Sequence, residues 1–200
     1  MNKIDEIFLK DVEIFSKSYF KYLGDIFNRI DLSEIRIFVD TLLDARKKGA
    51  RIFFIGNGGS ASTSSHFAND LAFGVNEYNK PFRVMSLTDN VSVLTALGND
   101  FGYDEIFTRQ LKIYANRGDV LVGISASGNS TNLILAFEYA KTCGVKTIAL
   151  TAFDGGKLKK IADHGIHVPT GLKEYGPAED VHMILDHLVT AYLSRYIKSA

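Results

Sequence analysis

The stretch that decides the fold is "RIFFIGNGGSASTSSHFAND", residues 51–70. An apolar strand-like run is followed by a loop of Gly, Asn and Ser and then by a segment with helical periodicity. A loop of this kind, at the end of a strand and the start of a helix, exposes backbone N–H groups that attract an anion. In the helix, His66 and Asp70 are four residues apart and therefore share one face, so they are candidate metal ligands.

The same pattern returns in "LVGISASGNS", residues 121–130. Apolar runs at 51–56, 82–87, 119–125, 145–151 and 166–169 alternate with helical segments, which predicts a doubly wound, mainly parallel, five-stranded α/β sheet. In such a sheet both loops lie beyond the carboxyl ends of their strands, where ligands bind. One loop alone would equally suit a tight turn with an N-cap serine. Two equivalent loops favour a phosphate site, with hydroxyl donors from Ser60, Ser125, Ser127 and Ser130.

A dinucleotide is a poor match for the first loop. Gly56, Gly58 and Ala61 satisfy the loose form of the G-x-G-x-x-A fingerprint. No acidic residue closes a second strand at the expected distance, because Glu77 lies in a polar loop and Asp89 comes later. The chain also has no Gly-Lys-Ser or Gly-Lys-Thr, which excludes the P-loop that binds ATP.

The composition is that of an ordinary globular domain, and we expect one domain over 1–200, with subunit-packing helices in 1–50 and the α/β core in 51–200. Of its 200 residues, 46% are hydrophobic, and 23 basic residues balance 23 acidic ones, so we expect neither nucleic acid nor a membrane as a partner. The single cysteine, Cys143, and an N-terminus without the pattern of a signal peptide predict a cytoplasmic location.

Three long helices are predicted outside the alternating region. Apolar residues at helical spacing predict one helix over 4–30, bent near Gly24, whose aromatic stripe favours packing against another subunit. Asp31 and Glu34 resemble a capping box that opens a second helix, ending near Gly49. The last helix is expected over 178–197, entered through Gly176 and Pro177.

Five segments in this order and spacing resemble the phosphoheptose isomerases of the sugar-isomerase (SIS) domain superfamily: "GNGGSASTSSHFANDL", "LGNDFGYDEIF", "GDVLVGISASGNSTN", "ALTAFDGGKL" and "AEDVHMILDH". The resemblance implies a homotetramer with the SIS fold. It also implies that sedoheptulose 7-phosphate, a phosphorylated seven-carbon sugar, is converted to glycero-manno-heptose 7-phosphate for bacterial surface glycans. The substrate-binding residues that it implies are Asn57, Gly58, Gly59, Ser60, Asn99, Asp100, Ser125, Ala126, Ser127, Ser130 and Glu179.

The resemblance further implies one zinc ion in each active site, held here by His66, Asp70, Glu179 and His187. Asp70 would act as the base and His187 as the acid in an isomerisation through an enediol. The family has glutamate at position 70 and glutamine at position 179. Imidazole and carboxylate are ordinary zinc ligands, so the set remains chemically suitable.

The two departures leave alternatives open. Because aspartate is one methylene shorter than glutamate, Asp70 is either the base or only a ligand while Glu179 transfers the proton. His182 shares a helix face with Glu179 and could replace a ligand or lie at a subunit interface. A non-catalytic relative that associates with the replication initiator DnaA, and an isomerase or sensor for another phosphosugar, are the alternative functions; His187 favours the enzyme. His164 and His167 flank the predicted edge strand and are expected to be structural or surface residues.

Overall fold

The computed structural model describes residues 2–199, and its centre is one parallel sheet of five strands. The strand order is β2-β1-β3-β4-β5, and every neighbouring pair is parallel. This confirms the predicted α/β class and all five predicted strands. The strands are β1 (Arg51–Gly56), β2 (Arg83–Ser86), β3 (Val120–Ser125), β4 (Lys146–Ala152) and β5 (His164–Val168).

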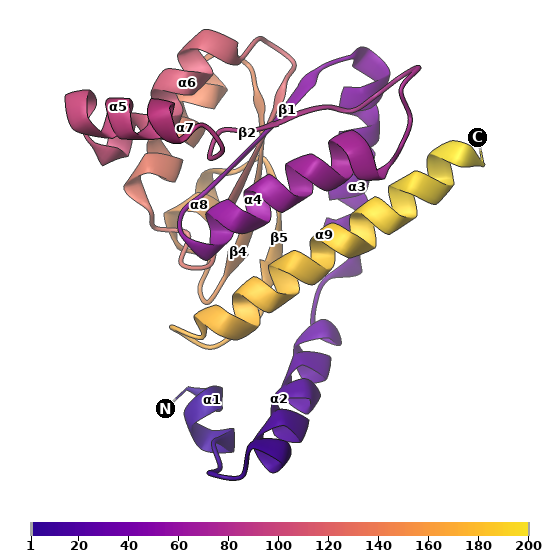
Figure 1. Cartoon of the computed structure of the whole chain (residues 1–200), viewed down its shortest axis with the longest axis vertical. Coiled ribbons are helices and arrows are strands. Elements are labelled where there is room, and N and C mark those ends of the chain that lie inside the picture. The colour runs from indigo at the N-terminus through magenta and orange to yellow at the C-terminus, as the bar shows by residue number, and fades with distance from the viewer. Residues whose placement is uncertain (1, 200) are drawn as a thin grey trace.

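Helices cover both faces of the sheet (Figure 1). On one face lie α3 (Leu32–Lys48), α4 (Gly59–Asn69) and α9 (Tyr175–Lys198), and on the other lie α6 (Ile106–Tyr114), α7 (Thr131–Thr142) and α8 (Gly156–Ile161). The predicted last helix is confirmed, although it begins three residues early. The remaining elements are α1 (Lys3–Ile7), α2 (Val12–Phe27), the π-helical turn η1 (Asp70–Gly74), α5 (Val91–Phe101) and the 3-10 turn η2 (Tyr103–Glu105).

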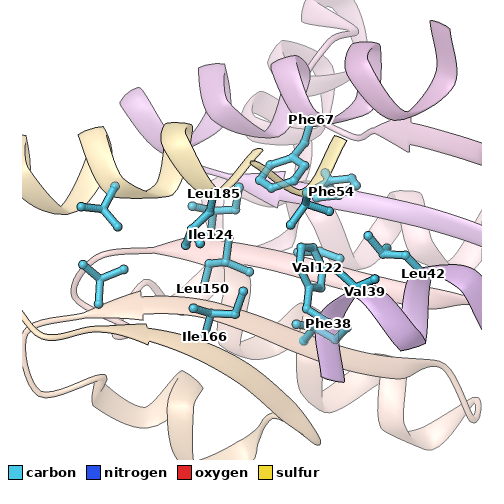
Figure 2. Close-up of a cluster of buried hydrophobic side chains, with 14 of the residues drawn as sticks. Phe38, Val39, Leu42, Phe54, Phe67, Val122, Ile124, Leu150, Ile166 and Leu185 are labelled. Atoms are coloured by element: carbon cyan, nitrogen blue, oxygen red, sulfur yellow. The ribbon is translucent and has the colours of Figure 1, made fainter. Parts of the chain in front are cut away.

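Alternate residues of the central strands β1, β3 and β4 enter two separate cores. In β1, Ile52 and Phe54 pack on the side of α3, α4 and α9, whereas Phe53 and Ile55 pack on the side of α6 and α7. Figure 2 shows the first core, in which Phe38 and Leu42 of α3, Phe67 of α4 and Leu185 of α9 converge on the strand side chains. Burying such a set of large apolar side chains contributes about 1.5–3 kcal/mol each, which fixes α4 and α9 against the sheet.

The expected single helix over 4–30 is wrong in detail, because the structure divides it into α1 and α2. Phe8 ends α1 in an extended conformation, and the side chain of Asp11 accepts hydrogen bonds from the N–H groups of Glu13 and Ile14 to begin α2. Because an aspartate side chain caps the first N–H groups of a helix, Asp11 favours the start of a new helix over the continuation of α1. Gly24 lies inside α2, which runs through it to Phe27.

The predicted capping box at the start of α3 is only half formed. Asp31 accepts from the N–H of Ser33, as an N-cap should. The carboxylate of Glu34 instead accepts the N–H of His167 in β5 at 2.8 Å. Glu34 therefore fastens α3 to the edge strand instead of closing the helix end.

None of the helices described over residues 2–199 combines the length and the apolar character required to cross a membrane.

Candidate functional site

The two glycine and serine loops meet at the point where the strand order reverses. The chain leaves β1 toward β2 on one side and returns to β3 on the other side of β1, so the loops after β1 and β3 are neighbours. Crevices at such reversal points are the usual ligand sites of open parallel sheets. A pocket of about 150 Å³ lies there, lined by Asn57, Ser60, Ile124, Ser125, Ala126, Ser127, Ser130, Tyr175 and Glu179.

The two loops are held together by a reciprocal amide pair. Asn57 Nδ2 donates to Asn132 Oδ1 and Asn132 Nδ2 donates to Asn57 Oδ1, both at 2.9 Å. The hydroxyl of Tyr103 also donates to Asn57 Oδ1 at 2.9 Å. Asn132 is buried, so the pair has little competition from water. This network fixes the spacing of the two loops before any ligand binds.

The serine loop opens α7 with its polar groups directed to the pocket. Ser130 is the N-cap residue of α7, yet its side chain makes no capping hydrogen bond. Its hydroxyl is therefore available to a ligand, beside the amino end of a helix of 12 residues. The positive end of the helix dipole and hydroxyl donors together suit a phosphate group.

Glu179 lies against the first loop and not among the other expected ligands. A Cβ added to Gly59 would overlap the carboxylate of Glu179, so this carboxylate packs directly on the glycine at the start of α4. Burial, followed by the nearby charge of Asp180, raises the pKa of Glu179. Because Glu179 lines the same pocket as the serines, its carboxylate can accept hydrogen bonds from sugar hydroxyl groups.

A second group, suited to a metal ion, lies farther along α4 and α9. Ligand atoms of His66, Asp70, Asp186 and His187 lie within 4.8 Å of one another. His66 Nε2 is 3.1 Å from His187 Nε2 and 3.6 Å from Asp70 Oδ2. Asp70 opens the π-helical turn η1, in which the N–H of Val75 donates to the carbonyl of Asp70. Such turns occur often at functional sites, since they change the direction of side chains in an α-helix.

Asp186 is the buried member of this group. Its side chain is 0% exposed; Oδ1 accepts from the hydroxyl of Thr190, but Oδ2 has no hydrogen-bond partner among the described residues. Burial and then the charge of Asp70 raise the pKa of Asp186 to about 7. An orphaned buried oxygen beside two imidazoles is what a divalent cation would satisfy, so these residues fit zinc.

His182 does not join the metal group. It lies on the buried face of α9, and burial lowers its pKa to about 4. His167 is half-buried in β5, where its Nδ1 lies 3.1 Å from the hydroxyl of Thr151. His164 is exposed at the start of the same strand.

The structure thus brings together most, but not all, of the expected site. Asn99 and Asp100 lie near the end of α5 and contact each other, outside the residues that line the pocket. Asp186 was missed, although a heptad separates it from Glu179 and places both within about 20° on the helix. Asn132, Tyr103 and Tyr175 were also missed, although Asn132 and Tyr103 lie within two of the five segments that resemble the family and Tyr175 lies four residues before Glu179.

Comparison with known proteins gives one consistent family. Residues 18–152 match the model of the SIS domain. A phosphoheptose isomerase of Akkermansia muciniphila is 43% identical over 84% of this chain and 86% of its own length. That of Helicobacter pylori strain P12 is 38% identical over 79% and 81%. The structure of a phosphoheptose isomerase from Neisseria gonorrhoeae superposes with a TM-score of 0.82 at 29% identity, covering 92% of this chain and 99% of the other.

Proposed function

The chain belongs to the phosphoheptose isomerases of the SIS domain family, and from this premise we propose that it interconverts sedoheptulose 7-phosphate and glycero-manno-heptose 7-phosphate. The enzyme is an aldose–ketose isomerase.

The observation that carries the proposal is the separation between the phosphate pocket and the metal-type group. Helices α4 and α9 lie side by side (Figure 1), with Gly59 near Glu179 at one end and His66 near His187 at the other. Seven residues on α4 and eight on α9 correspond to about 10 and 12 Å along the helices. A heptose has six carbon–carbon bonds of about 1.5 Å each, so its carbon chain is of similar length. A phosphate held by the serines would leave C1 and C2 beside the histidines.

The reaction requires a base at carbon and an acid at oxygen. In our proposal the Asp70 carboxylate removes a proton from C1 of the ketose and returns it to C2. His187, whose Nε2 faces the metal-type group, acts through Nδ1: it protonates the oxygen on C2 and removes the hydroxyl proton on C1. The enediol between these steps has one proton fewer on carbon and one more on oxygen than the ketose, so the sugar gains and loses no proton overall. Glu179 holds hydroxyl groups in the middle of the sugar chain. Asn99 and Asp100 stay in the proposal as contacts implied by resemblance alone.

We also propose that zinc is the resident metal. The residues that would hold it belong to the group on α4, η1 and α9, with His66 and His187 as the nitrogen ligands. When bound, zinc would act as a Lewis acid that polarises the carbonyl and hydroxyl oxygens of the sugar.

A turnover assay on sedoheptulose 7-phosphate, with zinc supplied, tests the assignment. Wild type should be active, and Asp70→Asn and His187→Ala should each lower kcat by about 10²–10⁴-fold, the usual contribution of a positioned acid or base. Glu179→Gln should chiefly raise KM. The matched control is His164→Gln, which changes an exposed histidine away from the pocket and should retain the wild-type rate.

Inactive wild type would contradict the proposed reaction, and unchanged rates in both Asp70→Asn and His187→Ala would contradict the proposed roles. Faster turnover of a five- or six-carbon ketose phosphate would support the alternative substrate class. The position of His187 in the four-residue group supports an enzyme over a non-catalytic partner of DnaA.

The wider setting is proposed from the family resemblance: a cytoplasmic homotetramer that supplies heptose for surface glycans. Exposed apolar side chains of the first 20 residues support assembly, among them Phe8 at 61%, Val12 at 70% and Phe20 at 69% exposed. Sedimentation should therefore show an assembly, and a monomer at micromolar concentration would contradict this part.

A further inference from the structure

We propose that Asp186, and not Glu179, is the fourth metal ligand of this chain, completing a set of two histidines and two aspartates. The inference rests on the proposed metal-assisted isomerase, but its test measures metal binding without substrate. It concerns a residue that the family resemblance did not indicate.

The interatomic distances correspond to one tetrahedral ion. Zinc–ligand bonds of about 2.0–2.1 Å place neighbouring ligand atoms about 3.3 Å apart in a tetrahedron. His66 Nε2 lies 3.1 Å from His187 Nε2, 3.6 Å from Asp70 Oδ2 and 3.9 Å from Asp186 Oδ2. The first two separations are within about 0.3 Å of that edge and the third is about 0.6 Å longer, and ligand atoms of all four residues lie within 4.8 Å of one another. The four side chains are thus already gathered around one point.

The unpartnered oxygen of Asp186 is an independent indication. Oδ2 has no hydrogen-bond partner among residues 2–199, while Oδ1 is oriented by the hydroxyl of Thr190 at 3.3 Å. A ligand carboxylate is typically held in this way, with one oxygen bonded to the protein and the other left to the metal. A buried oxygen without any partner costs about 1–3 kcal/mol, and a cation would offset that cost.

Glu179 is directed elsewhere by its neighbours. Its carboxylate packs on Gly59 and lines the pocket formed by the two serine loops. This pocket lies at one end of the α4–α9 contact, and the histidines lie at the other. Two helical turns separate Glu179 from Asp186, about 10 Å along α9. Asp186 lies on nearly the same face of the helix and belongs to the group that contains both histidines. The carboxylate of Glu179 is thereby left free for the sugar.

Metal binding by two isosteric variants tests this assignment. Wild type, Asp186→Asn and Glu179→Gln are stripped with a chelator, and zinc affinity is measured by competition with a chromophoric chelator. Cobalt(II) replaces zinc to report the ligand field by visible absorption. Asp186→Asn should weaken zinc binding by about a hundredfold or more, because even the loss of an outer partner costs 10–100-fold, and should alter the cobalt spectrum. Glu179→Gln should change neither.

Wild-type affinity and an unchanged cobalt spectrum in Asp186→Asn would overturn the inference, as would a loss of zinc in Glu179→Gln. A wild type that binds no zinc and no cobalt would overturn it too. Thermal unfolding of the stripped proteins shows whether each variant is folded, and Asp186→Ala repeats the test if Asp186→Asn is not. Turnover of the sugar by wild type is scored separately, so failure of the proposed reaction and failure of this ligand assignment give different results.

Discussion

Lowering the pH should destabilise this protein through His182. The imidazole is 0% exposed, and neither ring nitrogen has a hydrogen-bond partner among the described residues. Burial therefore lowers its pKa from the ordinary 6.5 to about 4. Between these two values the unfolded chain binds a proton that the folded chain rejects, so the free energy of unfolding falls as the pH falls. At about 1.4 kcal/mol per pH unit, the gap of about 2.5 corresponds to about 3 kcal/mol.

The assay is urea unfolding of wild type and His182→Leu from about pH 7 down to about pH 4. Asp186, with its raised pKa, contributes in the opposite direction: its extra stability is present at low pH and lost as the pH rises toward 7. The two proteins share Asp186, so the difference between them isolates His182. Relative to the variant, wild type should lose about 3 kcal/mol over this range. The control His164→Gln, at an exposed histidine, should follow wild type. Parallel pH profiles for wild type and His182→Leu would refute the reasoning.

Two glycine substitutions test the site and the core. Gly59→Ala should displace the Glu179 carboxylate and raise KM for the sugar by about tenfold. The unfolding free energy should change little, since only the end of a flexible side chain must move. An unchanged KM would count against a sugar contact by Glu179. Gly123→Ala in β3 would place a Cβ 2.5 Å from the ring of Phe137 and should lower the unfolding free energy by about 1–3 kcal/mol in a urea titration. The control is Gly98→Ala, because a Cβ added to Gly98 has no atom within 4 Å. This substitution should be neutral or stabilising by up to about 1 kcal/mol. Equal effects of Gly123→Ala and Gly98→Ala would contradict the packing argument.

The fold could be predicted because its signals are local. Short apolar runs place all five strands, and the helical period of apolar residues places the helix that carries His187. Both patterns follow from the local geometry of the backbone. The division into α1 and α2 was missed because the break depends on which way Asp11 turns its side chain. Glu34 was assigned to a capping box because its actual partner, the N–H of His167, is 133 residues away.

The sequence by itself determined that two serine-rich loops follow two strands of a parallel sheet and that His66 and Asp70 share a helix face. Parallel strands end at one edge, so these statements need no knowledge of packing. Only the tertiary structure decided which α9 carboxylate joins the histidines. Glu179 and Asp186 project from nearly the same face, and the spacing in the sequence does not separate them. The docking of α9 along α4 sets one beside Gly59 and buries the other beside His66, because depth and neighbours depend on how the two helices pack.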